Sequence, residues 1–231
     1  MFELQIPVPV LLIIGVLISL TLLSVYVSRV YLPAKIKRAN LRSITALAAA
    51  VETKESGTVG HAQRVAQLTT ELARKLGVEG HDLERIEYAA LLIDIGKANV
   101  PQGLLNKRDP LTPEEWAVIQ SHPRLGAEMV QAVPFLADLT ESVLHHHEYW
   151  DGAGYPDGLK GEQIPLGSRI LSVAADFDAM VSERPYHTRP WTREEALKEI
   201  VQFTGTKYDP AVVRVFQEVA SDSLPGEAQA A

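Results

Sequence analysis

Cysteine is absent from this chain of 231 residues. Its absence excludes a disulfide framework, thiolate zinc sites, thiol nucleophiles and cysteine-bound iron–sulfur clusters. It is also typical of a protein in a reducing compartment. Glycine and proline number only 15 and 14, which is too few for a collagen-like or proline-rich architecture. The remaining composition, with 46% hydrophobic and 22% charged residues, is that of a globular protein.

Positive charge is scarce beyond residue 42. Residues 1–42 hold five of the 22 basic side chains and one of the 29 acidic ones, so residues 43–231 carry 17 basic and 28 acidic groups and a net charge of −11. A region this acidic is a poor partner for duplex nucleic acid, whose phosphates require basic surfaces. An anionic ligand would need local cations or metal ions to overcome the negative field.

Charged side chains are also missing between Leu4 and Ser28, where most residues are Leu, Ile or Val. About 20 such residues in a helix cross the hydrocarbon core of a membrane. A cleaved signal peptide is disfavoured because the run has no basic segment before it and no small-residue cleavage site after it. A buried core helix seldom lacks polar residues for so long. We therefore predict that residues 1–33 are a single-pass transmembrane anchor, and the five basic residues after the run place the C-terminal side in the cytoplasm.

Strand-like alternation and internal repeats are absent as well, and the helical signals predict an all-α fold. A connector helix is expected over 34–56, which could be a simple juxtamembrane segment or a dimer stalk. The domain itself is expected over 57–220, followed by a flexible tail over 221–231. Thr112 and Thr192 each begin a capping box, with Glu three residues later. Other helices are predicted at 61–76, 82–95, 135–147 and 167–183 and from Asp209-Pro210 onward, with a loop at the Gly-rich 150–161.

The residues with the clearest chemistry are five histidines outside any obvious surface pattern: His61, His122, His145, His146 and His147. With the aspartates at 94, 176 and 178 they offer nitrogen and oxygen ligands from several helices, as in a transition-metal site of a helical bundle. Neighbouring helical residues diverge by about 100°, so only two of the three consecutive histidines could face one point, at a frayed helix end. Helix caps or surface groups are the alternative, and spacing alone does not decide between them.

Six segments occur in the order of a known family: GHAQRV (60–65), LLIDIGK (91–97), SHP (121–123), HHEYWDGAGYPDGLKG (146–161), FDAMVSERPY (177–186) and YDPAVV (208–213). Through them, and above all through the long HHE-x-x-DG-x-GYP block, the chain resembles the HD-GYP family from about Glu52 to Phe216. The resemblance implies an HD-type helical bundle that hydrolyses the bacterial second messenger cyclic di-GMP. It also implies a binuclear iron or manganese centre, and together with the anchor it places the protein at the bacterial inner membrane.

The same resemblance assigns roles to individual residues. One metal would be held by His61, the residue at 93, Asp94 and the residue at 175, and the other by Asp94, His122, His146 and His147. The implied catalytic residues are Asp94 and Lys97, with Lys97 placed to neutralise a phosphate. The implied substrate contacts are Arg64, Lys97, Asp151, Gly154, Tyr155, Pro156 and Arg184. Salt bridges are an equal alternative for the arginines, and turn chemistry for the glycine.

The sequence departs from the family pattern at the first metal position. Ile93 stands where the family has its histidine, and Ala175 stands where the late metal-binding aspartate belongs. The neighbouring Asp176 is offset by one residue, which turns a helical side chain by about 100°, so it could substitute only if the helix carried a bulge. Gly57 replaces a glutamate that some members use for a third metal. We therefore expect one metal rather than two, and weak or absent hydrolysis.

Three functions remain open at this stage. The chain could be an active cyclic di-GMP phosphodiesterase with an unusual metal site. It could instead be a degenerate module that binds the nucleotide, or a partner such as a diguanylate cyclase-type domain, without cleavage. The third is a metal-dependent phosphohydrolase acting on another phosphate ester. A homodimer is compatible with each of them.

Overall fold

The computed structural model describes residues 7–183 and 189–223, with side chains described as far as residue 220. The chain divides into two units, Met1–Ser43 and Ile44–Ala231. The predicted tail therefore falls almost wholly outside the described residues, as does Arg184.

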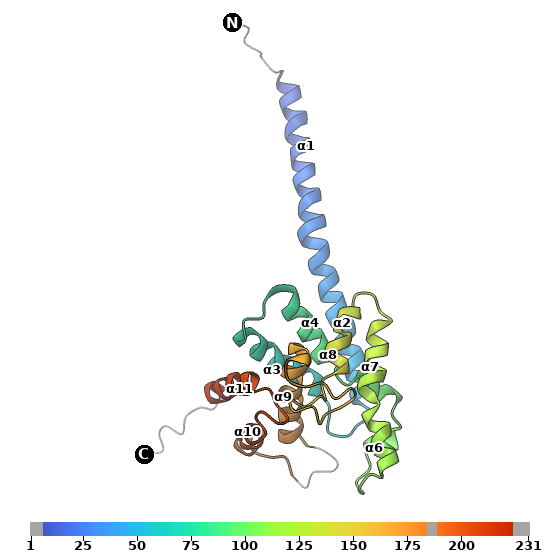
Figure 1. The fold of residues 1–231 in the computed structure, drawn as a ribbon. Helices are drawn as coiled ribbons and strands as arrows, with labels where there is room; N and C mark the ends of the chain where they lie inside the picture. The colour runs from blue at the N-terminus through green and yellow to red at the C-terminus, as the bar shows by residue number, and fades with distance from the viewer. Residues whose placement is uncertain (1–6, 184–188, 224–231) are drawn as a thin grey trace, which may run out of the picture. The chain divides into compact units, whose positions relative to one another are not determined.

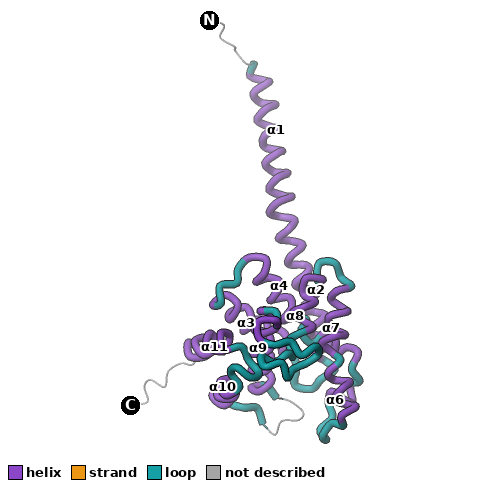
Figure 2. The backbone as a smooth tube through the Cα atoms, in the orientation of Figure 1, coloured by secondary structure: helices purple, strands orange, loops and turns teal. Residues whose placement is uncertain are grey.

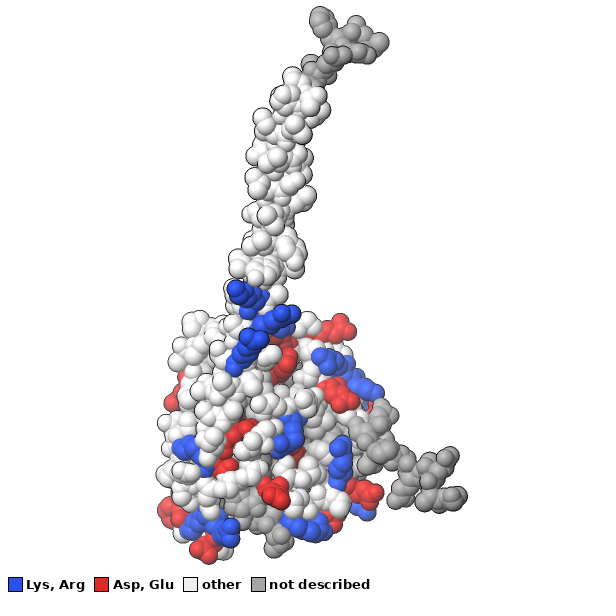
Figure 3. All heavy atoms as spheres, turned by 180° about the vertical axis from the view of Figure 1, so that it is seen from behind, with Lys and Arg blue, Asp and Glu red and all other residues white. Residues whose placement is uncertain are grey.

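The N-terminal unit is helical throughout its described part. Helix α1 (Val8–Tyr26) continues through a π-helical turn, η1 (Val27–Tyr31), into α2 (Leu32–Glu52), which ends in the second unit. Pro7 caps α1, where its missing N–H costs nothing, and no charged side chain interrupts α1 (Figure 3). The hydroxyl of Ser19 donates to the carbonyl of Gly15 at 2.9 Å, so this polar group is satisfied within the helix. By length and composition this helix is a candidate membrane span, and none of its most apolar stretch is buried in the protein.

The second unit consists of helices and loops, as Figures 1 and 2 show, and its described residues contain only an isolated β-bridge between Thr204 and Tyr208. The predicted all-α fold is confirmed. After α2 the elements are α3 (His61–Lys75), α4 (Gly80–Leu91), η2 (Ile95–Asn99), α5 (Gln102–Leu105), α6 (Pro113–Gln120), α7 (His122–Gln131), η3 (Ala137–Leu139), α8 (Thr140–Leu144), η4 (Gly161–Gln163), α9 (Leu166–Val181), α10 (Arg193–Gln202) and α11 (Pro210–Ser223).

The hydrophobic core lies where α9 packs against α3, α10 and α11. Leu72 of α3 and Ile170 of α9 are fully buried there, and the rings of Phe177 and Phe216 meet edge to face with centroids 5.1 Å apart. Each such side chain contributes roughly 1.5–3 kcal/mol through removal of apolar surface from water. This core fixes α3 and α9, the two helices that carry His61 and the predicted late-aspartate position.

Both predicted capping boxes are present. In each, the threonine hydroxyl accepts the N–H of the glutamate three residues on, and the glutamate carboxylate accepts the threonine N–H. Helices α6 and α10 therefore begin where the sequence placed them.

Three predicted helix ends were wrong by more than two residues. The connector helix ends at Glu52 rather than 56, because the Thr58 hydroxyl donates to the Glu52 carbonyl at 2.8 Å and closes a turn. Helix α4 ends at Leu91 rather than 95, and the chain continues as the 3₁₀ turn η2. The segment 135–147 holds only η3 and the short α8, so His145, His146 and His147 lie in a turn instead of a helix.

Candidate metal centre

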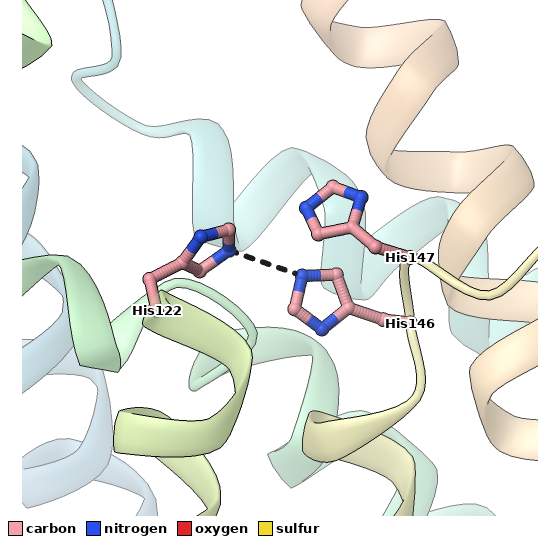
Figure 4. Close-up of side chains that lie close together, drawn as sticks. All are labelled: His122, His146 and His147. Atoms are coloured by element: carbon pink, nitrogen blue, oxygen red, sulfur yellow. Dashed lines mark hydrogen bonds between the residues drawn. The ribbon is translucent and has the colours of Figure 1, made fainter. Parts of the chain in front are cut away.

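Three histidine rings meet between the start of α7 and the turn after α8. His122 is the first residue of α7, and His146 and His147 lie in the turn (Figure 4). The ring centroid of His122 is 5.3 Å from that of His146 and 5.1 Å from that of His147. One ligand nitrogen from each ring lies within 4.8 Å of the others. The end of α8 thus allows two consecutive histidines to face one point, which a regular helix would not.

Backbone carbonyls set the tautomers of two of these rings. The Nδ1 atom of His122 lies 2.8 Å from the carbonyl oxygen of Ile119, and Nδ1 of His146 lies 2.6 Å from that of Val143. A carbonyl only accepts hydrogen bonds, so each Nδ1 carries the proton. With each ring proton on Nδ1, the two Nε2 atoms hold lone pairs and face each other at 3.3 Å (Figure 4). Neither can donate to the other, and a cation between them would satisfy both.

Burial keeps the imidazoles of His146 and His147 in the neutral form that binds metals. It lowers the pKa of His146 to about 3, and it lowers the pKa of His147 well below its usual value. Both rings are therefore neutral at physiological pH, the state in which imidazole binds metals.

Asp94 links the histidine cluster to α3. Its Oδ1 atom lies 3.4 Å from His122 Nε2, and its Oδ2 atom lies 3.6 Å from His61 Nε2. Burial alone would raise the pKa of this carboxyl, but Lys97, His122 and His61 outweigh it and hold the pKa well below its usual range. Asp94 is thus a carboxylate with one oxygen toward each side, as a bridging ligand requires.

Close packing of η2 on α7 brings Asp94 and His122 together. A Cβ atom at Gly96 would overlap the carbonyl oxygen of His122, so only glycine permits this approach. The contact also accounts for the early end of α4, because a helix continued to 95 would not place Gly96 there.

Asp178 orients the ring of His61, although the sequence indicated Asp178 only as a possible oxygen ligand for a metal. The Nδ1 atom of His61 lies 2.7 Å from Oδ2 of Asp178, and the Arg64 guanidinium donates to both oxygens of the same carboxylate, at 2.6 and 3.0 Å. Burial opposes ionisation, but the hydrogen bonds from His61 and Arg64 prevail and lower the pKa of Asp178 to about 2. The ring nitrogen Nε2 is thereby aimed at Asp94. Arg64 thus has the structural role that the sequence left open.

The two positions that depart from the family pattern face the same cleft as the histidines. Ile93, which is 1% exposed, and Ala175 both line it. Neither offers a lone pair, so His61 and Asp94 are the predicted ligands present at the first metal position. Gly57 lies in the turn before α3 with a φ of +82°, a conformation that a glutamate would adopt only with strain.

Asp176 is engaged elsewhere. Its Oδ2 atom lies 2.9 Å from the ammonium group of Lys207 and accepts the Tyr208 hydroxyl at 3.0 Å. Helix α9 runs through this position as an α-helix, so the one-residue offset is not compensated by a bulge. The side chain lines the cleft, but as the partner of Lys207.

Lys97 lies between two carboxylates. Its Nζ atom is 2.9 Å from Asp94 Oδ2 and 2.9 Å from Glu55 Oε2. Burial opposes the charge of the lysine, but both carboxylates outweigh it and raise its pKa, so the ammonium group persists. Sequence reasoning missed Glu55, which follows the end of α2 and is 7% exposed.

The cleft beside these residues has a volume of about 630 Å³, within the usual range of ligand sites. Its wall adds basic and aromatic groups that the sequence did not single out: Lys107, Arg108, Trp116, Tyr149 and Lys207. Tyr155, one of the implied substrate contacts, lines it too, with its ring 4.9 Å from that of His147 and stacked on it.

Two other implied substrate contacts in the Gly-rich loop, Asp151 and Gly154, stabilise the shape of the loop itself. Asp151 is exposed and accepts the Ala153 N–H at 2.9 Å, which organises the loop. A Cβ atom at Gly154 would overlap the backbone of Tyr149, so this glycine is required by the close turn. Among the described residues, the cleft wall does not include Arg64, Asp151, Gly154 or Pro156.

The geometry agrees with comparisons to known proteins. The family model for the HD domain matches residues 45–212. The chain belongs to the HD domain family. It is 39% identical over 173 residues to a cyclic di-GMP phosphodiesterase of Thermotoga maritima, covering 74% of this chain and 47% of that protein. It is also 39% identical over 173 residues to the cyclic di-GMP phosphodiesterase response regulator RpfG of Xanthomonas campestris, covering 74% and 46%.

These matches confirm the HD-GYP resemblance, and the chain spans about half the length of the two relatives. Among solved structures, a cyclic GMP-AMP-specific phosphodiesterase of Vibrio cholerae superposes with a TM-score of 0.63 at 22% identity, covering 78% of this chain and 48% of that one. At this identity the likeness concerns the fold.

Proposed function

We propose that this HD domain binds cyclic di-GMP in the cleft and hydrolyses it weakly, with the help of a divalent metal. The observation that carries the proposal is the convergence of His122, His146, His147 and Asp94 on the wall of a ligand-sized cleft. The relatives named as cyclic di-GMP phosphodiesterases suggest the substrate.

The residues present fit one metal. Two Nε2 lone pairs face each other, His147 lies beside them, and Asp94 adds a carboxylate oxygen. Such a set of imidazoles and one carboxylate suits iron, manganese or zinc. A metal held there supplies positive charge, which polarises a phosphoryl oxygen and lowers the pKa of a water molecule.

The chain's own side chains would then bind and orient the nucleotide. Lys97 and Lys207 place ammonium groups on the cleft wall, where they offset the acidic character of the domain for an anionic ligand. Tyr155 and Trp116 offer aromatic faces for the bases, since stacking on aromatic rings is a common way to hold nucleobases.

We expect hydrolysis to be weak because the first metal position lacks two of its four ligands. With His61 and Asp94 but without ligands at 93 and 175, a second ion would be held loosely, and the two-metal clamp on the attacking and leaving oxygens would be incomplete. A second candidate function, a receptor that binds cyclic di-GMP without cleaving it, is favoured by Ile93 and Ala175 facing the cleft. The diguanylate cyclase-type partner, the homodimer and the inner-membrane anchor stay predictions.

The test uses the full chain purified in detergent. Binding of cyclic di-GMP and its turnover with added manganese or iron are measured for the wild type and for Asp94→Asn. Binding with slow, metal-stimulated turnover that Asp94→Asn abolishes supports the proposal. Binding without turnover selects the receptor, and failure to bind rejects both functions.

A further inference from the structure

A second group of ligand-type side chains includes a residue of the same turn after α8. It consists of His145, Glu148 and Asp157, with ligand atoms within 4.8 Å of one another. Its members are distinct from those of the His122–His146–His147 cluster. We propose that these three residues form a separate site for a divalent transition metal such as Zn²⁺.

His145 presents an unpaired nitrogen to this site. The side chain is 5% exposed, and its Nε2 atom lies 3.3 Å from Oε2 of Glu141. The Glu141 carboxylate only accepts, and it is the carboxylate nearest to the ring, so we place the ring proton on Nε2 and a lone pair on Nδ1. The Nδ1 atom is buried and has no hydrogen-bond partner among the described residues. It lies 3.5 Å from Glu148 Oε1 and 3.9 Å from Asp157 Oδ2.

Both carboxylates are held in place by other contacts. The Arg124 guanidinium donates to Oδ1 of Asp157 at 2.8 Å, and Oδ2 of the same group is the atom nearest His145. Glu148 is 2% exposed and accepts the N–H of Asp157 at 2.7 Å and of Leu159 at 3.1 Å. Each carboxylate oxygen has two lone pairs, so an oxygen that accepts one N–H can also bind a metal.

A cation resolves an otherwise unfavourable arrangement. With the ring proton on Nε2, the buried Nδ1 atom of His145 faces two carboxylate oxygens without a hydrogen bond, and polar groups left unpaired in buried positions are costly. Zinc binds nitrogen and oxygen ligands at about 2.0–2.2 Å, which separates the ligand atoms of a tetrahedral site by roughly 3.3–3.6 Å. The separations around Nδ1, 3.5 and 3.9 Å, are close to that range. Asp157 is exposed, so this ligand of the proposed site is in contact with solvent.

The site would tie two functional segments together. His145 directly precedes His146, and Asp157 lies two residues after Tyr155, whose ring stacks on His147. A metal joining His145 to Asp157 would therefore fasten the loop 148–159 to the turn that carries the histidine cluster. The inference does not depend on the proposed function, because its ligands and its test concern metal binding alone.

The experiment compares zinc bound by the full chain and by the variant Asp157→Asn. Metal-free protein in detergent is loaded with Zn²⁺, freed of excess ion and analysed for zinc and protein. Asparagine keeps the oxygen that accepts from Arg124 but loses the anionic ligand, so we expect Asp157→Asn to bind about one equivalent less than the wild type. Glu162→Gln is the matched control, because it removes one charge from an exposed site near the same loop and should bind as much zinc as the wild type.

A second readout locates the ion. Zinc should slow amide hydrogen exchange across residues 148–159 in the wild type, and also in His146→Ala/His147→Ala, where the main cluster is disrupted. It should not do so in Asp157→Asn. Equal zinc content and equal exchange in the wild type and Asp157→Asn would overturn the site. An equal loss of zinc in Glu162→Gln would also overturn it, since binding would then follow surface charge.

Discussion

The carboxylate of Glu55 holds the ammonium group of Lys97 at 2.9 Å, just after the connector helix ends. Lys97 lies equally close to Asp94, so its single positive charge is shared between two anions. The lysine that the family resemblance assigns to the phosphate is thus partly neutralised before any ligand arrives. Asp94 and Lys97 lie three positions apart, at the start of η2 and within it, whereas Glu55 comes from the turn after α2.

Replacing Glu55 with glutamine should strengthen nucleotide binding. The change removes one negative charge beside the cleft while keeping a side chain that can accept from Lys97. A gain of about 1 kcal/mol, or roughly fivefold tighter binding of cyclic di-GMP, is expected at low salt. Calorimetric titration of Glu55→Gln, the wild type and the surface control Glu114→Gln checks this. Unchanged or weaker binding by Glu55→Gln, with the same melting temperature as the wild type, would contradict it.

Asp178 gives a prediction for pH dependence. Its pKa is about 2 in the folded protein, below the value near 3.9 of an unfolded aspartate. The unfolded state therefore binds more protons on this group. The stabilising contribution of the Asp178 carboxylate, about 2–3 kcal/mol, is complete above pH 5 and decreases as the pH falls through 4 toward 2. Asp178→Asn should have a lower free energy of unfolding than the wild type at pH 7. This gap in the free energy of unfolding should shrink by about half at pH 3.

Urea unfolding of metal-free protein between pH 7 and pH 3 measures the gap. The exposed residue Asp138 provides the control, since Asp138→Asn should show a small difference at every pH. A gap for Asp178→Asn that stays constant down to pH 3 would mean that the carboxylate is not held by His61 and Arg64 in solution.

The metal content of the protein tests the position formed by Asp94, His122, His146 and His147. His146→Ala/His147→Ala leaves only Asp94 and His122 of the predicted set, so the variant should lose one equivalent of manganese or iron relative to the wild type. The exposed His81 serves for comparison, and His81→Ala should keep the full amount. Elemental analysis after removal of free metal decides the matter. Equal metal in all three proteins would exclude this cluster as a metal site.

Local signals in the sequence predicted the fold well, and long-range contacts explain what they missed. The capping boxes at Thr112 and Thr192 were readable because cap and partner lie within four residues. The end of α4 could not be predicted in this way, because it depends on a contact with α7, in which Gly96 packs against the carbonyl of His122.

The site shows the same division. The resemblance named His122, His146 and His147, which the structure brings together. No spacing rule connects His61 with Asp178, 117 positions further on, or Lys97 with Glu55, 42 positions before it. These pairs form because α3, α9 and η2 pack together in the folded chain, so they cannot be predicted from positions in the sequence.

The orientation of the N-terminal helix gives another prediction. The uncharged run followed by basic residues should hold the protein in the inner membrane with the C-terminus in the cytoplasm. A C-terminal green fluorescent protein fusion should fluoresce, and a C-terminal alkaline phosphatase fusion should be inactive. Deleting residues 1–33 should release the fusion to the soluble fraction. An active phosphatase fusion would reverse the orientation.

The last prediction concerns repair of the first metal position. Ile93 and Ala175 both face the cleft that holds His122 and His146, and His61 and Asp94 are already in place. Ile93→His with Ala175→Asp should therefore complete a four-ligand set and add one equivalent of manganese or iron. Without metal the new imidazole should cost about 1–3 kcal/mol, because Ile93 is buried, and metal binding should more than offset this cost.

The two single variants serve as controls, because they show whether a new side chain is tolerated without completing the set of four metal ligands. Ile93→His or Ala175→Asp alone supplies three ligands instead of four, so each should gain little metal and little activity. The double variant should also hydrolyse cyclic di-GMP at least tenfold faster than the wild type, because two metals can hold both the attacking and the leaving oxygen. A double variant that gains the metal but not the turnover would place the defect in nucleotide positioning, and the receptor function would then replace hydrolysis for this protein. No gain of metal would mean that the backbone at 93 or 175 has moved out of ligand reach.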